Sequence, residues 1–259
     1  AEKTGLKVNF HLEPYTDRTP MTVRQDLEYI VATYGSHPAF YRHPVRNLPM
    51  VYVYDAYISP AAEWAQLFSP TGSHTIRGTP IDHVIISLTL NPNDRQFLRD
   101  AHVDGFYTYF AAQGFTFAST LSSWPTLQRW AKEDGLIFIP SVGPGYDDTR
   151  IRPWNGANRR PRDNGQYYRN MWNAALGVES DIISLTSYNE WGEGTQLESA
   201  VPFTTATGEK LLDYGDGGVN FYMDLTHELV QRFKQQWHHR HRTETPEQPN
   251  ASAHEQHEL

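Results

Sequence analysis

Residues 182–196 read IISLTSYNEWGEGTQ, an apolar run that gives way to a glycine-rich loop with two carboxylates, Glu190 and Glu193. A short apolar run that is bounded by turn residues predicts a buried strand of a parallel sheet. The carboxyl ends of such strands open onto the loops in which α/β barrels place their active sites. This one stretch therefore predicts an α/β fold and the position of a site within it.

The same alternation of apolar runs with segments of helical period continues along the chain. Strands are predicted over residues 6–15, 48–55, 83–90, 105–110, 136–142 and 182–188. Helices are predicted between and after them, over residues 22–34, 61–68, 94–101, 124–134, 167–176 and 219–237. Strands that alternate with helices indicate β/α units around a parallel sheet.

The expected architecture is an α/β fold of the TIM-barrel type. A closed (β/α)8 barrel needs eight units, whereas only six are predicted. Residues 1–5 resemble the last turn of a helix that stops at Gly5 and leads directly into a strand. We therefore expect a (β/α)8 barrel that lacks about two N-terminal βα units, with residues 1–237 as its truncated catalytic domain. An open, doubly wound sheet is the alternative.

Residues 238–259 differ in composition from the rest of the chain. They lose the apolar periodicity and are rich in His, Glu, Pro and Gln. Such a segment has too few apolar side chains to bury a core. We expect a disordered polar tail.

The overall composition excludes several classes of function. The chain has 22 Lys and Arg against 30 Asp and Glu, a formal net charge of −8, which argues against nucleic acid and anionic membranes as partners. It contains no Cys, so disulfides and thiol catalysis are excluded. The familiar calcium, zinc and nucleotide motifs are absent, and no metal or cofactor is expected. A neutral polyol substrate fits this balance.

Carboxylates and tyrosines follow several of the predicted strands. Hydrolysis of a glycoside uses one carboxyl group to protonate the leaving oxygen and a second one at the sugar, which is the chemistry that Glu190 and Glu193 offer. An isolated E-x-x-E is a weak signal, because helix surfaces carry this spacing routinely, and Glu193 serving only the structure of its loop is the alternative. Glu13 is interpreted either as a third carboxylate of the site or as the partner of Arg18, and Asp148 as a turn former.

Longer blocks of sequence carry a specific resemblance. They are HLEPY at 11–15, YGSHPAFYR at 34–42, DGFYTYF at 104–110, IFIPSVGPGY at 137–146, IRPWN at 151–155 and NEWGEGTQLE at 189–198. In these blocks the chain resembles the endo-α-1,2-mannosidase family, glycoside hydrolase family 99, in order from about residue 5 to residue 237.

The resemblance implies a (β/α)8 barrel that cuts inside a glycan with retention of configuration and without a metal. Glu193 is then the general acid/base, and Glu190 deprotonates the 2-hydroxyl of the sugar to give a 1,2-anhydro sugar. This route departs from the usual covalent scheme of retaining enzymes. The residues implied to line the substrate pocket are Glu13, Tyr54, Tyr109, Arg152 and Asn189.

The resemblance also implies a partner and a location. Animal members act in the Golgi on glucosylated high-mannose N-glycans and are held there by an N-terminal membrane anchor, which is absent from this sequence. For the chain itself we expect a soluble monomer. Two alternatives stay open: a glycan-binding or inactive remnant of the fold, and a retaining glycosidase in which Glu190 is a covalent nucleophile.

Overall fold

The computed structural model describes residues 1–208, 210 and 214–242. Each predicted strand is found at its expected place as a shorter element. The strands are β1 (Phe10–Leu12), β2 (Met50–Val53), β3 (Val84–Leu88), β4 (Gly105–Tyr107), β5 (Ile137–Ile139), β6 (Ser141–Val142) and β7 (Ser184–Leu185). The predicted strand over residues 136–142 is divided into β5 and β6 at Pro140, because proline has no N–H to donate to a ladder.

All strand pairs in the ladders are parallel, and neighbours in the sheet are neighbours in the sequence. The larger sheet has the order β1-β2-β3-β4-β5, and a second ladder pairs β6 with β7. The main-chain N–H of Ser184 also donates to the carbonyl of Pro140 at 3.1 Å, so β7 continues the same curved wall. Among the described residues β1 and β7 are the edges of this wall. The strands therefore form an open, partial barrel.

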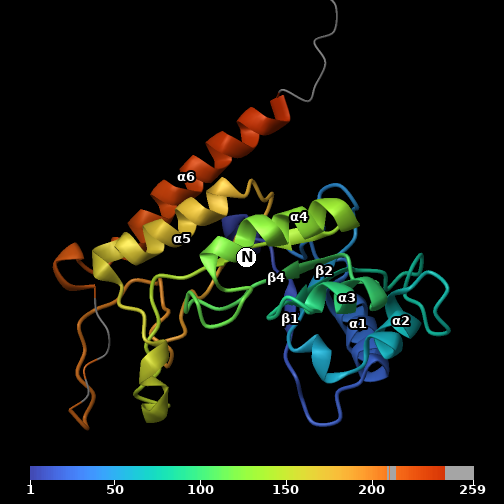
Figure 1. Ribbon diagram of the computed structural model, residues 1–259, viewed down its shortest axis with the longest axis horizontal. Coiled ribbons are helices and arrows are strands. Elements are labelled where there is room, and N and C mark those ends of the chain that lie inside the picture. The colour runs from blue at the N-terminus through green and yellow to red at the C-terminus, as the bar shows by residue number, and fades with distance from the viewer. Residues whose placement is uncertain (209, 211–213, 243–259) are drawn as a thin grey trace, which may run out of the picture.

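Six α-helices cover the wall. They are α1 (Pro20–Tyr34), α2 (Ala61–Phe68), α3 (Asp94–Asp100), α4 (Trp124–Asp134), α5 (Gln166–Gly177) and α6 (Phe221–Arg242). The short 3-10 helices are η1 (Glu2–Thr4), η2 (Ala56–Ile58), η3 (Leu121–Ser123), η4 (Pro153–Asn158), η5 (Asp163–Gly165) and η6 (Gly215–Gly217). In Figure 1, α1, α2 and α3 lie together toward the right of the view, and α5 and α6 run side by side toward the upper left, at the other end of the curved wall.

Helix α6 is longer than the sequence predicts, since it continues past residue 237 to Arg242. The ring of His241 stacks on Trp237 with centroids 4.0 Å apart, one turn earlier in the helix. Arg240 donates to the carbonyl of Ser180 at 3.2 Å. These contacts give polar residues a packed position that the loss of apolar periodicity does not reveal. The remainder of the predicted tail, residues 243–259, lies outside the described residues.

Two apolar clusters on opposite faces of the strands exclude the doubly wound alternative. Odd and even positions alternate along β2, where Val51 and Val53 belong to one cluster and Met50 to the other. Buried residues of all six α-helices belong to the first cluster, with Leu27 and Trp172 among them. The second cluster takes its buried residues from the strands alone. A doubly wound sheet has helices on both faces, whereas these helices cover one, as in a barrel.

None of the helices in the described part of the chain combines the length and the apolar character that crossing a bilayer requires.

Candidate active site

The carboxyl ends of the strands surround a cavity of about 330 Å³. Tyr54 follows β2, Tyr109 follows β4, and Glu193 lies in the loop after β7; all three line the cavity. Arg152 lines it from the segment after β6, just before η4. Four of the residues that were predicted from the sequence are thus brought together at one end of the barrel.

Glu193 is the most enclosed carboxylate among the predicted site residues. Its side chain is 23% exposed, and its Oε1 accepts a hydrogen bond from Arg152 Nη1 at 3.1 Å. Burial raises the pKa of Glu193 above its ordinary value, and the charge of Glu190 adds to this, while Arg152 opposes both. A raised pKa favours a protonated carboxyl near neutral pH, which is the form that a general acid needs.

Arg152 is held from its other side by a buried carboxylate, Asp148, which is 0% exposed. The same nitrogen, Arg152 Nη1, donates to Asp148 Oδ2 at 3.0 Å. Asn155 Nδ2 reaches the two carboxylate oxygens of Asp148 at 3.0 and 2.9 Å. Burial raises the pKa of Asp148, but these hydrogen bonds and one with Tyr146 outweigh it and leave the pKa below its ordinary value.

The chain reaches this arrangement through a close approach after β6. A Cβ added at Gly143 meets the side chain of Ala111 at 2.3 Å and the carbonyl of Thr186 at 2.6 Å, so only glycine fits there. Gly145, at φ 155°, then turns the chain toward Tyr146 and Asp148. The GPG sequence between β6 and the cavity is therefore what brings these two side chains to the site.

Tyr109 stands at the centre of the charged groups. Its backbone is left-handed at φ 57°, and it is held by Ser141 Oγ, which accepts from its N–H at 2.6 Å, and by Thr186 Oγ1, which donates to its carbonyl at 2.5 Å. Burial, followed by the charges of Glu193, Glu13 and Glu190, raises the pKa of Tyr109 to about 12. The phenol therefore stays protonated and can donate a hydrogen bond to a sugar oxygen.

Glu13 reaches the site through a histidine. Its Oε1 lies 2.8 Å from His11 Nδ1, and His11 Nε2 is 2.6 Å from the hydroxyl of Tyr107. The ring of His11 also stacks on Tyr109, with centroids 5.8 Å apart. Arg18 instead donates to the main-chain carbonyls that end β1 and β2, so the interpretation of Glu13 as its hydrogen-bonded partner is replaced by a pair with His11.

Glu190 and Asn189 are exposed on the loop that carries Glu193 and do not belong to the lining of the cavity. Glu190 Oε1 accepts from the main-chain N–H of Gly192 at 2.9 Å, so its carboxylate is turned onto its own loop. Ser187 Oγ accepts from the N–H of Glu190 at 2.8 Å and fixes the start of this turn. Neither Glu190 nor Asn189, which the resemblance implies as a pocket residue, is therefore part of the cavity wall in this structure.

Comparison with known proteins shows the family of the chain. The model of the family described as Glycosyl hydrolase family 99 matches residues 1–235. The chain belongs to glycosyl hydrolase family 99.

Relatives in this family cover most of the chain. It is 46% identical over 242 residues to "Glycoprotein endo-alpha-1,2-mannosidase" of Xenopus laevis, which covers 92% of this chain and 54% of that protein. The Mus musculus protein of the same name is 45% identical over 239 residues, 91% of this chain and 52% of its own length. The chain thus spans about half the length of these curated relatives.

A solved structure in the family has the same fold. The GH99 endo-alpha-mannosidase from Bacteroides thetaiotaomicron matches with a TM-score of 0.87 and 48% sequence identity, over 90% of this chain and 68% of that one. This likeness supports the description of the fold as a partial family 99 barrel.

Sequence reasoning missed one buried residue of this family 99 site. Asp148 was interpreted as a turn former, but it is fully enclosed and bonded to Arg152 and Asn155. A signal was present, since Arg152 follows Asp148 by four residues and Asn155 by seven. In a turn that is continued by a 3-10 helix, this spacing brings all three side chains together.

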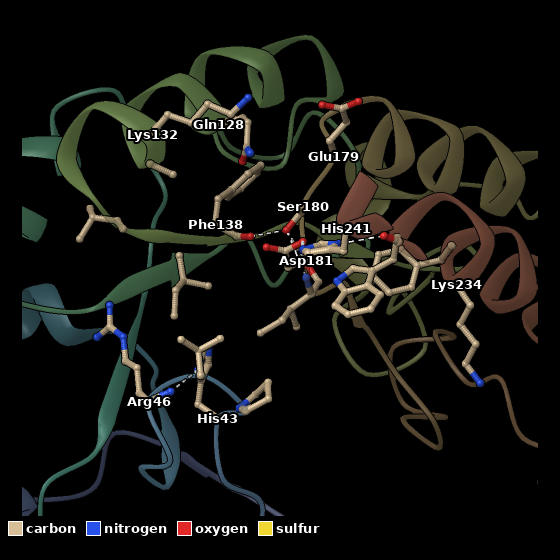
Figure 2. Close-up of a pocket in the computed structure, with 18 of the residues that line it drawn as sticks. His43, Arg46, Gln128, Lys132, Phe138, Glu179, Ser180, Asp181, Lys234 and His241 are labelled. Atoms are coloured by element: carbon tan, nitrogen blue, oxygen red, sulfur yellow. Dashed lines mark hydrogen bonds and ion pairs between the residues drawn. The ribbon is translucent and has the colours of Figure 1, made fainter. Parts of the chain in front are cut away.

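A larger cavity, of about 980 Å³, lies at the opposite ends of the strands of this family 99 chain. Figure 2 shows His43 and Arg46 from the segment before β2 on one side, and Asp181 and His241 on the other. Phe138 and Ser180 lie above Asp181 in this view, and Lys132 and Lys234 project at the rim. Within the described residues, no group of three or more His, Asp or Glu side chains is placed to hold a metal ion.

Proposed function

We propose that this chain is the catalytic region of a retaining endo-α-1,2-mannosidase that hydrolyses an internal α-1,2-mannosidic bond of high-mannose N-glycans, glucosylated or plain. The observation that carries the proposal is Glu193, a half-enclosed carboxylate with a raised pKa at the barrel end where TIM-type enzymes hold their sites. Family membership supplies the substrate class, because the curated relatives carry the name of this activity.

Glu193 acts as the general acid and then as the general base. Its proton goes to the leaving glycosidic oxygen, and the carboxylate formed then takes a proton from the water that completes hydrolysis. Burial supports the first step because it raises the pKa of the Glu193 carboxyl, and Arg152 supports the second because it stabilises the carboxylate at 3.1 Å. One residue thus serves both steps, as retention of configuration requires.

Glu190 takes the proton from the 2-hydroxyl of the mannose. The 2-oxygen then attacks the anomeric carbon as the bond to the leaving oxygen breaks, which gives a 1,2-anhydro sugar. For this step the Glu190 carboxylate leaves the N–H of Gly192 and turns to the sugar; it is exposed and free to rotate. Attack by Glu190 itself on the anomeric carbon is the alternative chemistry, and an ester trapped on Glu190 in mass spectrometry favours it.

The pocket residues bind the neutral sugar through hydrogen bonds and ring stacking. The rings of Tyr54 and Tyr109 meet edge to face with centroids 4.8 Å apart, and burial raises the pKa of both phenols, so that both donate. Glu13 and Asn189, exposed at the rim, contact hydroxyls further along the glycan. No cofactor takes part in this scheme.

The proposal extends to domain, partner and location. Residues 1–237 form the catalytic domain and residues 238–259 a polar tail. The partner is a mannose-containing N-glycan, the chain is a monomer, and the whole protein works in the Golgi lumen. These statements follow from the resemblance of the site motifs to those of the Golgi members of the family.

The experiment that tests the function is incubation of the chain with a glucosylated high-mannose glycan. Release of an oligosaccharide that contains the terminal glucose and its neighbouring mannose is expected, with the configuration at the new reducing end retained by NMR. Binding of the glycan without any release instead supports a second candidate, a glycan-binding remnant. The observation that favours it is the Glu190 carboxylate, which is bonded to Gly192 and not directed into the cavity.

A further inference from the structure

One buried ion of the site has no part in the proposed mechanism. Asp148 lies in the cavity wall, 0% exposed, with an ionised carboxylate that receives hydrogen bonds from Arg152 and Asn155. Placing a charge in such a position is costly unless it is paired and fully hydrogen-bonded. An aspartate that only forms a turn does not need to be buried, since turns carry their aspartates at the surface. The buried charge therefore calls for a reason beyond the turn.

We infer that Asp148 is a positioning residue that holds Arg152 against Glu193 and divides the charge of Arg152 between the two carboxylates, so that Glu193 keeps the proton that it donates. The inference rests on the proposed function of Glu193.

The geometry on which it stands is a shared donor. A single nitrogen, Arg152 Nη1, donates to Asp148 Oδ2 at 3.0 Å and to Glu193 Oε1 at 3.1 Å. The side chain of Arg152 is 43% exposed, so contacts other than burial must fix its position. Asp148 supplies that contact, because its own place is fixed by the two bonds from Asn155 Nδ2.

The charges of Arg152 and Asp148 act on the pKa of Glu193 in opposite directions. An arginine that faced Glu193 alone would strongly favour the carboxylate form and would remove the proton that a general acid needs. Asp148 offsets this effect, because its negative charge pairs with the same guanidinium and also disfavours a second negative charge nearby. Glu193 can then act as a general acid, and its carboxylate is still stabilised by Arg152 when it ionises.

The groups that act on Glu193 come from three segments of the barrel. Arg152 and Asp148 come from the loop after β6, which also carries Tyr146, and Glu190 comes from the same loop as Glu193 itself. Burial raises the pKa of Tyr109, at the end of β4, and the charge of Glu193 raises it further. Of these groups, Glu190 and Asp148 carry the negative charges that raise the pKa of Glu193, and Asp148 is the buried one.

The test is the titration of the Glu193 carboxyl in the whole chain, followed by NMR with 13C-labelled Glu and Asp and assigned with Glu193→Gln. In Asp148→Asn the amide oxygen can still accept from Arg152, so Arg152 keeps its place but has one carboxylate instead of two, and we expect the pKa of Glu193 to fall. In the activity assay the alkaline limb of the pH profile should move down by about one pH unit. An unchanged or higher pKa of Glu193 would overturn the inference.

Asp147→Asn is the matched control. Asp147 is the adjacent aspartate, but its Oδ2 pairs with Arg159 at 2.8 Å and its Oδ1 accepts from Thr149 Oγ1 at 2.6 Å. The variant removes a charge of the same sign from the same loop and leaves Arg152 untouched. We expect a smaller change in the titration of Glu193 than in Asp148→Asn; an equal change would mean that any negative charge of the loop acts on Glu193, and that Asp148 has no special part.

A second variant keeps the test open if Asp148→Asn fails to fold. Arg152→Gln changes a half-exposed side chain and leaves the buried carboxylate in place. A shared arginine stabilises both carboxylates, so its loss should raise the pKa of Asp148 and that of Glu193 together. A rise confined to Glu193 would contradict the sharing. Because NMR reads the carboxyls without substrate, a chain that releases no oligosaccharide contradicts the proposed function and leaves this result to be judged separately.

Discussion

The two ends of the barrel differ in what their cavities are made of. The cavity at the N-terminal ends of the strands is about 980 Å³, and that at the carboxyl ends is about 330 Å³. The larger one is lined by apolar side chains such as Phe138 and Trp237, and by Asp181, which is 64% exposed and pairs with His241 at 3.7 Å. The smaller one has its charged groups inside, bonded to one another. Bonded charge inside a cavity, and not volume, marks the end where chemistry is proposed.

The residues that form the two ends of the barrel show the same contrast. At the N-terminal ends, the buried residues of the strands belong to the core. This end of the barrel therefore contributes mainly to stability. At the carboxyl ends the chain tolerates a left-handed Tyr109 and a buried Asp148, both unfavourable unless their surroundings support them.

The largest effect is expected when the 2-hydroxyl of the sugar, the attacking group of the proposed route, is removed. A substrate whose 2-hydroxyl is replaced by hydrogen should not be turned over, because the attacking atom of the proposed route is missing. Glu190→Gln should be crippled to a similar degree, by more than the roughly 10²–10⁴-fold that loss of a general base typically costs. Release rates measured with matched mannose and 2-deoxymannose substrates decide the matter; brisk hydrolysis of the 2-deoxy substrate would leave Glu190 as a covalent nucleophile.

Removal of the acid should cost somewhat less and depend on the leaving group. Glu193→Gln should lower kcat by about 10²–10⁴-fold on the glycan and recover most of this on an aryl glycoside, which leaves without protonation. In the unaltered chain, activity should fall as pH rises through the raised pKa of Glu193, since the proton to be donated is lost. Equal losses on both substrates would argue against the acid role.

At the opposite end we expect a loss of stability without a matching loss of chemistry. Phe138 is 3% exposed and stacks on Phe106 with centroids 5.2 Å apart. Phe138→Ala should lower the free energy of unfolding by about 3–5 kcal/mol, through lost burial and a new cavity. Denaturant unfolding measures this loss, and kcat at a temperature where the variant stays folded should be nearly unchanged. A kcat that falls as far as in Glu193→Gln would erase the contrast between the ends.

The smallest effect is expected at the charged rim of the larger cavity. Lys132→Ala and Lys234→Ala change side chains that Figure 2 shows projecting at that rim. Surface substitutions of this kind usually change stability by no more than about 0.5 kcal/mol, and the kinetic constants should stay within about twofold. A marked rise in KM from either variant would show that the N-terminal end takes part in substrate binding.

The fold was predictable where local pattern decides the element. Helices over residues 61–68 and 124–134 were predicted with the bounds that α2 and α4 have. The strands were placed correctly but are shorter than their apolar runs, because the runs include residues such as Glu13 to Tyr15 that lie beyond the end of the ladder. The division at Pro140 was readable from the sequence, whereas the extra turn of α6 depends on tertiary contacts of Arg240 and is not.

Which residues gather at the cavity was easier to predict from the sequence than how their side chains are oriented. The strand-end rule placed Tyr54, Tyr109 and Glu193 at one cavity, since all three lie just beyond buried strands. It does not give the direction of a side chain, and Glu190 is turned onto Gly192. Nor does it give burial, which for Asp148 depends on partners supplied later in the chain. Side-chain direction and enclosure are tertiary properties that residue spacing alone does not encode.

The buried guanidinium of Arg18 has a consequence for how the open edge of the barrel moves. It is 8% exposed and donates to the carbonyls of Tyr54 at 2.6 Å and Asp55 at 2.7 Å, and more weakly to that of Leu12 at 3.4 Å. If the end of β1 peeled away alone, a buried cation would lose part of its hydrogen bonding, which is costly. The tips of β1 and β2 should therefore open as one cooperative unit, with amides that exchange their hydrogens at a common rate.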